Sequence, residues 1–272
     1  MSQGDKQMNE WVNQVLTPIL QGDMPDAEII SRLGGIALLS ADTDKIKEYV
    51  FKSSKLPEIR GASMILDDLN QGWPAERNYQ SYDTRQPCNL REIFFHYGMP
   101  TRRNKDDQRI DCIIYAGGGG LLALVPLDMA ETIKSEIETL YPRETIAATI
   151  SCVWQPIASS SSKQINFYDL MAHQSLLLRR AKEEKDPLSF FEAIPFARRC
   201  ESCQIRPAVK QVSPDKRWLC RSCHRKVERS KKLGGKGLVL QEGETWNRSR
   251  IQQSGVIGKM AFLSFHYPAV YR

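Results

Sequence analysis

Residues Tyr115–Pro126 read Tyr-Ala-Gly-Gly-Gly-Gly-Leu-Leu-Ala-Leu-Val-Pro. Apolar residues on both sides of four consecutive glycines predict a β-hairpin, with strands over 109–115 and 121–125 and a tip without side chains. Such a tip can hold phosphate groups through its backbone N–H groups, but with no carboxylate it cannot by itself hold a metal ion. The geometry of a tight turn would explain the glycines about as well.

Helices and strands are predicted on both sides of the hairpin from the spacing of apolar residues. Before it, we expect helices over 6–21 and 26–33, a strand over 36–40, and helices over 45–51, 58–69 and 90–97. After it, we expect a helix over 127–141 and a strand over 145–154. The order β-α-α-β-β-α-β is the split ferredoxin-like arrangement on which palm domains are built. The sequence therefore predicts an α+β fold, with an N-terminal helical cap (1–34) and a ferredoxin-like palm (35–157).

The composition of the 272-residue chain is that of an ordinary soluble protein, and its length allows two compact domains. No apolar run approaches the roughly 20 residues of a membrane-spanning helix, and Met1–Asn9 lacks the features of a secretory signal. We therefore expect a cytoplasmic, reducing location, in which the seven cysteines do not form a disulfide framework.

Positive charge is concentrated near the C-terminal end. Residues 198–236 hold 13 Lys or Arg and three Asp or Glu, a net +10, whereas the whole chain carries only +6. One basic segment on a mildly acidic body suggests a local contact with a polyanion. The alternative is that these charges only solvate a small module with little core.

Four cysteines in that basic segment form the most specific motif. Cys200-x2-Cys203, sixteen intervening residues and Cys220-x2-Cys223 match the spacing of a structural four-thiolate zinc site. We expect little core there beyond a few apolar side chains, so metal binding would supply most of the folding energy. Those side chains are Ile205, Val209, Val212, Trp218 and Leu219.

Other interpretations of these cysteines are less consistent with the sequence. Cys220 to His224 fits a haem-attachment pattern, but haem would leave Cys200 and Cys203 unexplained. A redox dithiol is disfavoured because no thioredoxin-like βαβ pattern surrounds either cysteine pair. Within a zinc site, His224 could replace Cys223 as a ligand. We assign 163–236 to a linker helix (168–184) and the zinc module, after a flexible joint at Ser159–Ser162. Residues 237–272 are a tail, or the start of a further domain, with a possible strand over 256–265.

Two further groups bear on a nucleotide site. Asp42 and Asp44 follow the first strand at a spacing that could bring them near the hairpin tip, although Asp42 fits equally well as the N-cap of the next helix. The segment Arg60–Ser63 adds a cation and a hydroxyl, or is simply an exposed helical turn.

Four motifs in this order resemble the large polymerase/cyclase-like subunit of type III CRISPR effector complexes: Ala37–Phe51, Leu56–Ser63, Tyr115–Gly119 and the four cysteines. The similarity spans about residues 30–230. In that family two palms face each other with the zinc module between them in sequence, and the second palm carries a Gly-Gly-Asp-Asp hairpin that converts ATP to cyclic oligoadenylate. The resemblance implies that this chain provides the first, degenerate palm.

The resemblance also implies which residues face the nucleotide, namely Arg60, Gly61, Ser63, Gly117, Gly118, Gly119 and Gly120. It implies a structural zinc ion, ATP and Mg²⁺ only together with a second palm, and other complex subunits with guide and target RNA as partners. No His-Asp dipeptide of an HD nuclease domain is present, and the resemblance implies that the chain stops about where the second palm's first strand would end. We therefore expect it to be inactive alone.

Two other functions remain open at this point. The chain could be an autonomous degenerate cyclase-like regulator that binds a nucleotide without turning it over. It could instead be a zinc-ribbon adaptor whose basic segment binds RNA and whose palm is only a scaffold.

Overall fold

The computed structural model describes residues 3–21, 23, 25–72, 86–102, 106–158, 167–185, 196–212 and 216–232. All of them belong to one compact unit, Met1–Leu233. The predicted joint at Ser159–Ser162 and the tail segment 237–272, with its possible strand, lie outside the described residues.

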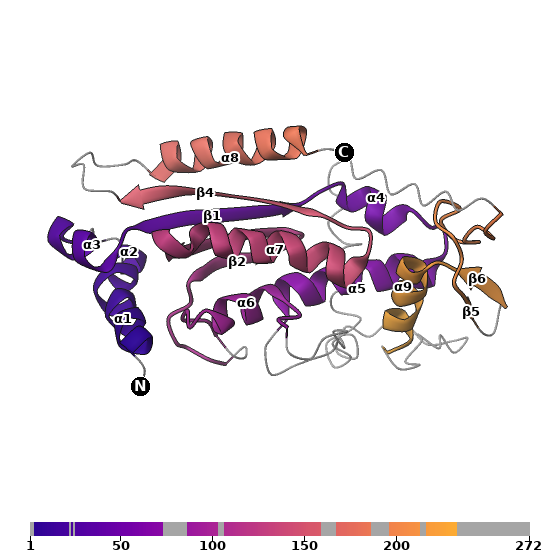
Figure 1. Ribbon diagram of the computed structural model, residues 1–272, viewed down its shortest axis with the longest axis horizontal. Helices are drawn as coiled ribbons and strands as arrows, with labels where there is room; N and C mark the ends of the chain where they lie inside the picture. Colours follow the sequence, from indigo (N-terminus) through magenta and orange to yellow (C-terminus); the bar gives the residue numbers. More distant parts are fainter. Residues whose placement is uncertain are drawn as a thin grey trace, which may run out of the picture. The chain divides into compact units, whose positions relative to one another are not determined.

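A four-stranded antiparallel sheet forms the centre of this unit (Figure 1). Its strands are β1 (Ile36–Thr43), β2 (Ile113–Gly117), β3 (Gly120–Pro126) and β4 (Ile150–Ala158), in the spatial order β2-β3-β1-β4. Helices connect β1 to β2 and β3 to β4, so the strands follow one another as in the predicted β-α-α-β-β-α-β order, with three helices rather than two between β1 and β2. The predicted α+β class is confirmed.

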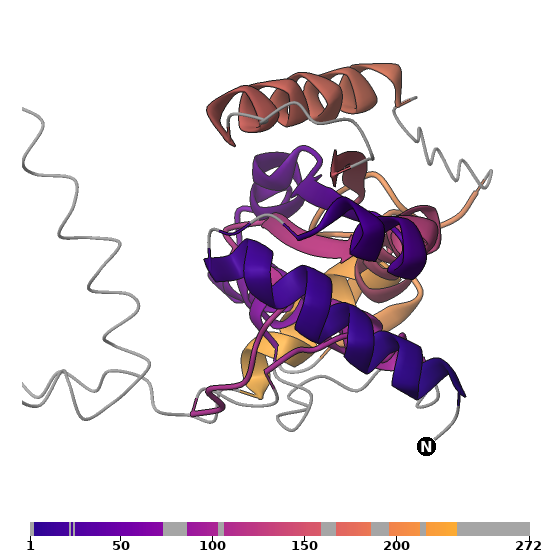
Figure 2. The ribbon, with the colours of Figure 1, turned by 90° about the vertical axis from the view of Figure 1, so that its left-hand side faces the viewer.

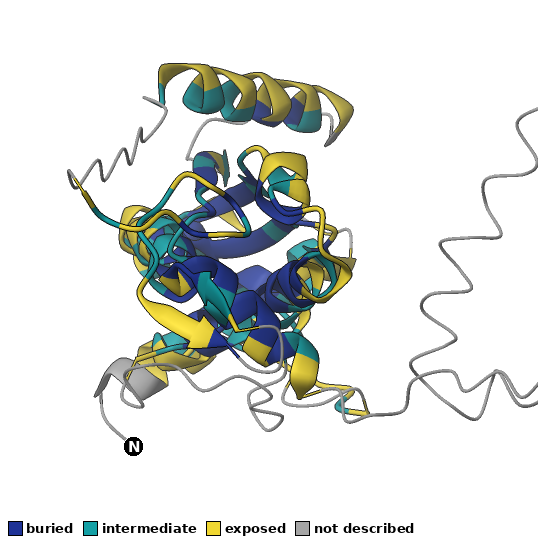
Figure 3. Ribbon diagram, turned by 90° about the vertical axis from the view of Figure 1, so that its right-hand side faces the viewer, coloured by how far each residue is buried: buried dark blue, intermediate teal, exposed yellow. Residues whose placement is uncertain are grey.

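Helices cover both faces of the sheet, as Figure 1 shows. Helices α5 (Leu56–Gln71), α6 (Leu90–His96) and α7 (Ala130–Thr145) lie on one side, and α8 (Phe167–Glu184) lies on the other. The short helix α4 (Ile46–Phe51) follows β1 directly. Gln174 of α8 donates to the carbonyl oxygens of Leu38 and Val153, which ties this helix to β1 and β4. The surface of α8 that faces away from the sheet is exposed (Figure 3).

The described residues before β1 are largely helical. They form α1 (Gln3–Trp11), a π-helical turn (Val12–Leu16), α2 (Thr17–Gln21) and α3 (Ala27–Leu33), which Figure 2 shows in indigo at the near end. Trp11, Val15 and Leu16 are buried in the core that these helices share with the sheet. Their burial explains why the apolar residues of this segment recur at helical spacing, since they form the one face that packs on the core.

Two predicted boundaries were wrong at the sheet. Helix α7 continues to Thr145, where we had predicted the start of a strand, because the Thr145 hydroxyl accepts from the backbone N–H groups of Ala147 and Ala148 and closes the helix. Strand β4 therefore begins only at Ile150.

Strand β1 is longer than predicted and reaches Thr43, which pairs with Ile150 of β4. Asp42 thus lies inside a strand, and the N-cap of α4 is Lys45 in the left-handed conformation. The predicted N-cap role of Asp42 is wrong.

The four cysteines lie in a small module of residues 196–232, which we call the cysteine module. It contains the strands β5 (Lys210–Val212) and β6 (Arg217–Leu219) and the helix α9 (Arg221–Lys231). Its own core consists of the four cysteines with Val212, Leu219 and Val227. Two residues predicted to be core, Ile205 and Val209, are 37% and 51% exposed. Both residues lie before β5, outside the two strands, and neither belongs to the buried cluster.

Candidate functional site

The hairpin tip, Gly118–Gly119, is the two-residue turn between β2 and β3. Both glycines have positive φ values, 59° and 92°, as a turn that matches the twist of the strands requires. The outer glycines, Gly117 and Gly120, lie in the strands and pair with each other. The hairpin is confirmed, with a tip that is shorter than the glycine run.

The hairpin tip is fixed to the end of β1. The carbonyl oxygen of Gly119 accepts from the backbone N–H and from the hydroxyl of Thr43, at 2.8 and 2.9 Å. A Cβ atom on Gly119 would lie 3.0 Å from Ile46 Cδ1, so this position packs closely against α4. The register sets Asp42 opposite Gly120, which brings the carboxylate of Asp42 to the level of the tip, as its spacing suggested.

Tyr115 was missed by sequence reasoning. Its ring is 57% exposed beside the hairpin tip, and its hydroxyl donates to the carbonyl oxygen of Gly117 at 2.9 Å. The alternation of a regular strand would bury Tyr115 together with Ile113, but the register of β2 shifts between these two residues. The shift turns the ring outward, and the local sequence, with Ile113 and Ile114 before Tyr115 and Ala116 after it, gives no signal of this.

The two carboxylates at the end of β1 are already paired with ammonium groups of α8 and the residue after it. Lys182 donates to Asp42, and Lys185 lies 3.5 Å from Asp44. Ser151 donates to the other oxygen of Asp44 at 2.8 Å. These contacts neutralise the charges that would otherwise attract a divalent cation.

The segment Arg60–Ser63 lies in the first half of α5. A Cβ atom on Gly61 would lie 1.8 Å from the carbonyl oxygen of Lys226, so this glycine allows α9 to pack directly on α5. Ser63 is exposed, and its hydroxyl donates to Ile59 of its own helix. Gln71 lies ten residues after Gly61 in α5, and its side chain reaches Gly117 of the hairpin.

Ten helical residues span about 15 Å. The predicted nucleotide-facing residues therefore fall into two places, with the hairpin glycines at one end of α5 and Arg60–Ser63 near the cysteine module. Whether Arg60 and Ser63 contact a nucleotide stays a prediction.

The four predicted metal ligands come together. One sulfur from each of Cys200, Cys203, Cys220 and Cys223 lies within 4.8 Å of all the others, and all four side chains are buried. Among the described residues this is the only such group of Cys, His, Asp and Glu, and it does not include His224. The set could hold a zinc ion, because four thiolates in a closed shell are the donors of structural zinc sites. Haem attachment or a redox dithiol would use only one Cys-x-x-Cys pair. Neither explains why the sulfurs of both pairs lie in one cluster.

Local backbone contacts position these thiols. The N–H of Cys200 donates to the carbonyl oxygen of Arg206, which closes the first Cys-x-x-Cys knuckle, and the sulfur of Cys220 caps the N-terminus of α9 by accepting from the N–H of Cys223. Mutual hydrogen bonds among the four thiols lower the pKa of Cys203 and raise the pKa of Cys223, as expected of close thiols that share protons.

Helix α9 joins the cysteine module to the rest of the fold through buried positive charges. Arg225 pairs with Glu144 of α7 at 2.6 Å, and Arg229 makes a two-pronged contact with Asp68 of α5 at 2.5 and 2.9 Å. Burial lowers the pKa of Arg225 to about 10. Such pairs are stable only when every partner is present.

Lys226 is the third buried cation of α9. Its amine donates to the carbonyl oxygen of Tyr49 at 2.6 Å and lies 3.9 Å from the centre of the Tyr49 ring. Together with Arg225 and Arg229, it shows that part of the basic segment is inside the fold. Fewer cations are therefore left to contact RNA than the sequence suggested, and the alternative of a purely solvated charge run is wrong for these three.

Comparisons with known proteins give a weak similarity. No protein-family model and no curated protein match the sequence. The described fold is similar to the crystal structure of Csm1 from T. onnurineus, with 14% identity, a TM-score of 0.38, and coverage of 56% of this chain and 20% of that one. A Csm1-Csm4 cassette in complex with AMPPNP gives 15% identity, a TM-score of 0.39, and coverage of 55% and 19%.

A Csm1-Csm4 subcomplex of the type III-A CRISPR-Csm interference complex gives 14% identity and a TM-score of 0.39, with coverage of 64% of this chain and 22% of that chain. The chain thus spans about a fifth of the length of the solved chains that it matches. Among the described residues, none of the helices has the length and apolarity that crossing a bilayer demands.

Proposed function

We propose that this chain is a component of a type III CRISPR effector complex, in which its sheet and hairpin tip complete a nucleotide pocket whose catalytic carboxylates lie on a second palm. The observation that carries the proposal is the hairpin tip itself. It is a two-residue glycine turn with no carboxylate, and only the Tyr115 hydroxyl, at 3.5 Å, lies near the position that a Cβ atom on Gly118 would take, so its backbone N–H groups would be open to a phosphate.

The residues around the tip support a binding role without catalysis. Phosphoryl transfer by a palm needs carboxylates that hold two divalent cations. Here Asp42 is neutralised by Lys182, and Asp44 is held by Ser151 and Lys185. ATP with Mg²⁺ would therefore be bound productively only when another palm supplies the carboxylates.

Tyr115 would add affinity for the base of the nucleotide. An exposed aromatic ring beside a phosphate-binding turn is a surface on which a base can stack, worth about 1–3 kcal/mol. The hydrogen bond from Tyr115 to Gly117 fixes the ring in place, so little entropy would be lost when a base stacks on it.

The cysteine module would hold a structural zinc ion through Cys200, Cys203, Cys220 and Cys223. A zinc ion with four thiolates has no open position for water, so it supplies a cross-link and no reaction chemistry. In the complex, this cross-link would keep α9 seated on α5 and α7, and so keep the palm in shape beside its neighbours. The other complex subunits, with guide and target RNA, would be its partners.

Reconstitution tests this function. The chain would be combined with the other complex subunits, including a palm with a Gly-Gly-Asp-Asp hairpin, and with guide and target RNA, and synthesis of cyclic oligoadenylate from ATP would be followed by chromatography. We expect no product from the chain alone, product from the full mixture, and about tenfold less product with Tyr115→Ala, consistent with the loss of one stacked base. Tyr115→His, which keeps a ring, is the matched control. Turnover of ATP by the isolated chain would contradict the proposal.

A further inference from the structure

Helix α5 contacts the cysteine module along one face. Arg217 of β6 donates to the carboxylate of Glu58 at 2.7 Å, near the start of the helix. The backbone of α9 then lies against Gly61, at a distance where no Cβ atom fits. Two turns further along the helix, Asp68 accepts two hydrogen bonds from Arg229. These three positions of α5 lie at helical spacing, so the module is bound along most of the length of the helix.

The last turn of α5 reaches the hairpin by one direct contact. The amide nitrogen of Gln71 lies 2.8 Å from the position that a Cβ atom on Gly117 would take, so this side chain covers one side of the strand end that leads into the tip. Gln71 follows Asp68 by about one helical turn. The pair of Asp68 with Arg229 therefore fixes the same turn of α5 that contacts Gly117.

A second contact runs through buried polar groups. Asn70, also in the last turn of α5, is 1% exposed. Burial raises the pKa of the Tyr141 hydroxyl, whereas Thr43 and Asn70 lower it, which places these three polar groups together. Thr43 in turn donates to the carbonyl oxygen of Gly119 at 2.9 Å. The last turn of α5 thus supports the hairpin at two places, Gly117 and Gly119.

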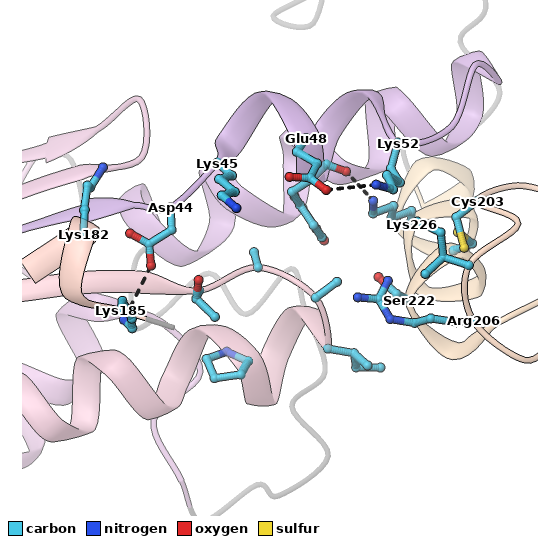
Figure 4. Close-up of a pocket in the computed structure, with 18 of the residues that line it drawn as sticks. Asp44, Lys45, Glu48, Lys52, Lys182, Lys185, Cys203, Arg206, Ser222 and Lys226 are labelled. Atoms are coloured by element: carbon cyan, nitrogen blue, oxygen red, sulfur yellow. Dashed lines mark hydrogen bonds and ion pairs between the residues drawn. The ribbon is translucent and has the colours of Figure 1, made fainter. Parts of the chain in front are cut away.

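The position of the cysteine module on α5 depends on its four thiols. The buried core of the module consists of the cysteines and three apolar side chains, a core too small to hold the module together without a metal ion. When the module is folded, α9 is fixed by buried cations. Figure 4 shows one of them, Lys226, reaching toward α4, where its amine binds the carbonyl oxygen of Tyr49. Loss of zinc would release this lysine together with Arg217 and Arg229.

Release of the module would leave two acids of α5 without their counter-ions. Glu58 is 0% exposed, and the two side chains that donate to it, Arg217 and Ser202, both belong to the module. Asp68 would lose Arg229. A buried carboxylate without its partner is strongly destabilising, so α5 would have to turn or shift until water reaches it. Such a shift of a helix also moves its last turn.

We propose that α5 couples zinc binding in the cysteine module to the geometry of the hairpin tip, with Asp68 and Gln71 as positioning residues. With zinc bound, Arg229 holds the last turn of α5, and Gln71 stays against Gly117. Without zinc this turn is released, and the tip takes up other conformations, because glycines have no side chains of their own to restrict them. The inference rests on the proposed zinc ion but not on the binding of a nucleotide.

Nuclear magnetic resonance of the full chain with isotope-labelled glycine tests the coupling. Asp68→Asn removes the charge that binds Arg229 and leaves the four thiols intact. With zinc content confirmed by mass spectrometry, we expect the amide signals of Gly117 and Gly119 to shift by more than their line widths. The signal of Gly34, which precedes β1 and so lies at the other end of this strand from the tip, should stay in place. Chelation of zinc from the unmodified chain should shift the same two signals further.

A double variant shows whether Gln71 carries the effect. In a Gln71→Ala background, Asp68→Asn should shift the Gly117 signal by less than half as much, because the side chain that connects the two positions is gone. Normal coupling in this background would show that Gln71 is not a positioning residue and would overturn its assignment.

Asp67→Asn is the matched control, since it removes the same charge from the neighbouring residue, which is exposed. All glycine signals should stay within their line widths in this variant. The coupling is overturned if the tip signals of zinc-loaded Asp68→Asn are unchanged, or if Asp67→Asn shifts them equally. A chain that binds no zinc would overturn the proposed zinc site, and the coupling with it, so the two failures are distinguishable.

Discussion

Gly61 and the hairpin tip show two opposite uses of glycine in one molecule. At Gly61 the missing side chain is replaced by the backbone of α9, at a distance where no Cβ atom fits. At Gly118 the backbone needs a positive φ, and a Cβ atom would meet only the Tyr115 hydroxyl, at 3.5 Å. The first glycine builds the fold by joining the cysteine module to α5, and the second leaves a surface open for a ligand.

The largest effect should come from removing a metal ligand. Such a change affects the cysteine module, which packs on α5 at Gly61, and changes no residue of the hairpin tip. Cys203→Ser should abolish zinc binding and lower the free energy of unfolding by about 5 kcal/mol or more, because structural zinc contributes much of the stability of such modules. Zinc content by mass spectrometry and urea unfolding would measure this. Cys152→Ala, in β4 and outside the cluster, should keep one zinc ion per chain. Full zinc content in Cys203→Ser would show that the four thiols do not form the site.

Breaking one buried ion pair should have the next largest effect. Arg225→Met leaves the buried carboxylate of Glu144 with fewer partners and should cost about 3 kcal/mol in urea unfolding. The double variant Arg225→Met with Glu144→Gln should cost less than the sum of the two single changes, because the second change removes the uncompensated charge. Strict additivity would mean that the two side chains do not interact.

Gly61→Ala should destabilise the protein by about 2 kcal/mol, since α9 must shift to admit the methyl group. A decrease of roughly 4–8 °C in the unfolding temperature corresponds to this change. Ser63→Ala, on the exposed side of the same helix, should leave the unfolding temperature unchanged. Equal melting of the two variants would show that α9 does not pack against Gly61 in solution.

The smallest effect is expected at the hairpin tip. Gly118→Ala should cost roughly 1 kcal/mol, because a residue with a Cβ atom is strained at positive φ. Gly118→Asn should be almost neutral, since asparagine is common at this position of two-residue turns. Both are measured by thermal unfolding. A larger loss in Gly118→Asn than in Gly61→Ala would reverse the comparison.

The sequence predicts the elements more accurately than it predicts the contacts between them. The hairpin, the order of strands and the four-cysteine cluster follow from local patterns such as a glycine run, apolar spacing and paired Cys-x-x-Cys motifs. The boundaries at Asp42 and Thr145 were wrong because strand pairing and a threonine cap decide them, and both depend on residues distant in sequence or on side-chain geometry.

The role of α9 could not be predicted from the sequence. The sequence of α9, Arg221 to Lys231, is typical of a charged surface helix. Only the fold shows that Arg225, Lys226 and Arg229 bind partners 81, 177 and 161 residues away in the sequence. Tyr115 was missed for a related reason, because a shift in strand register has no local signature. Long-range pairing, rather than residue type, decides both cases.

Hydrogen exchange with and without a zinc chelator tests most directly whether the cysteine module and the palm form one cooperative unit. We predict that chelation removes the protection of amides in α5 and in the last turns of α7, as well as in α9, because the buried contacts of Gly61, Asp68 and Glu144 are lost together. If chelation exposes only the amides of residues 196–232 and leaves α5 fully protected, the module is an independent appendage.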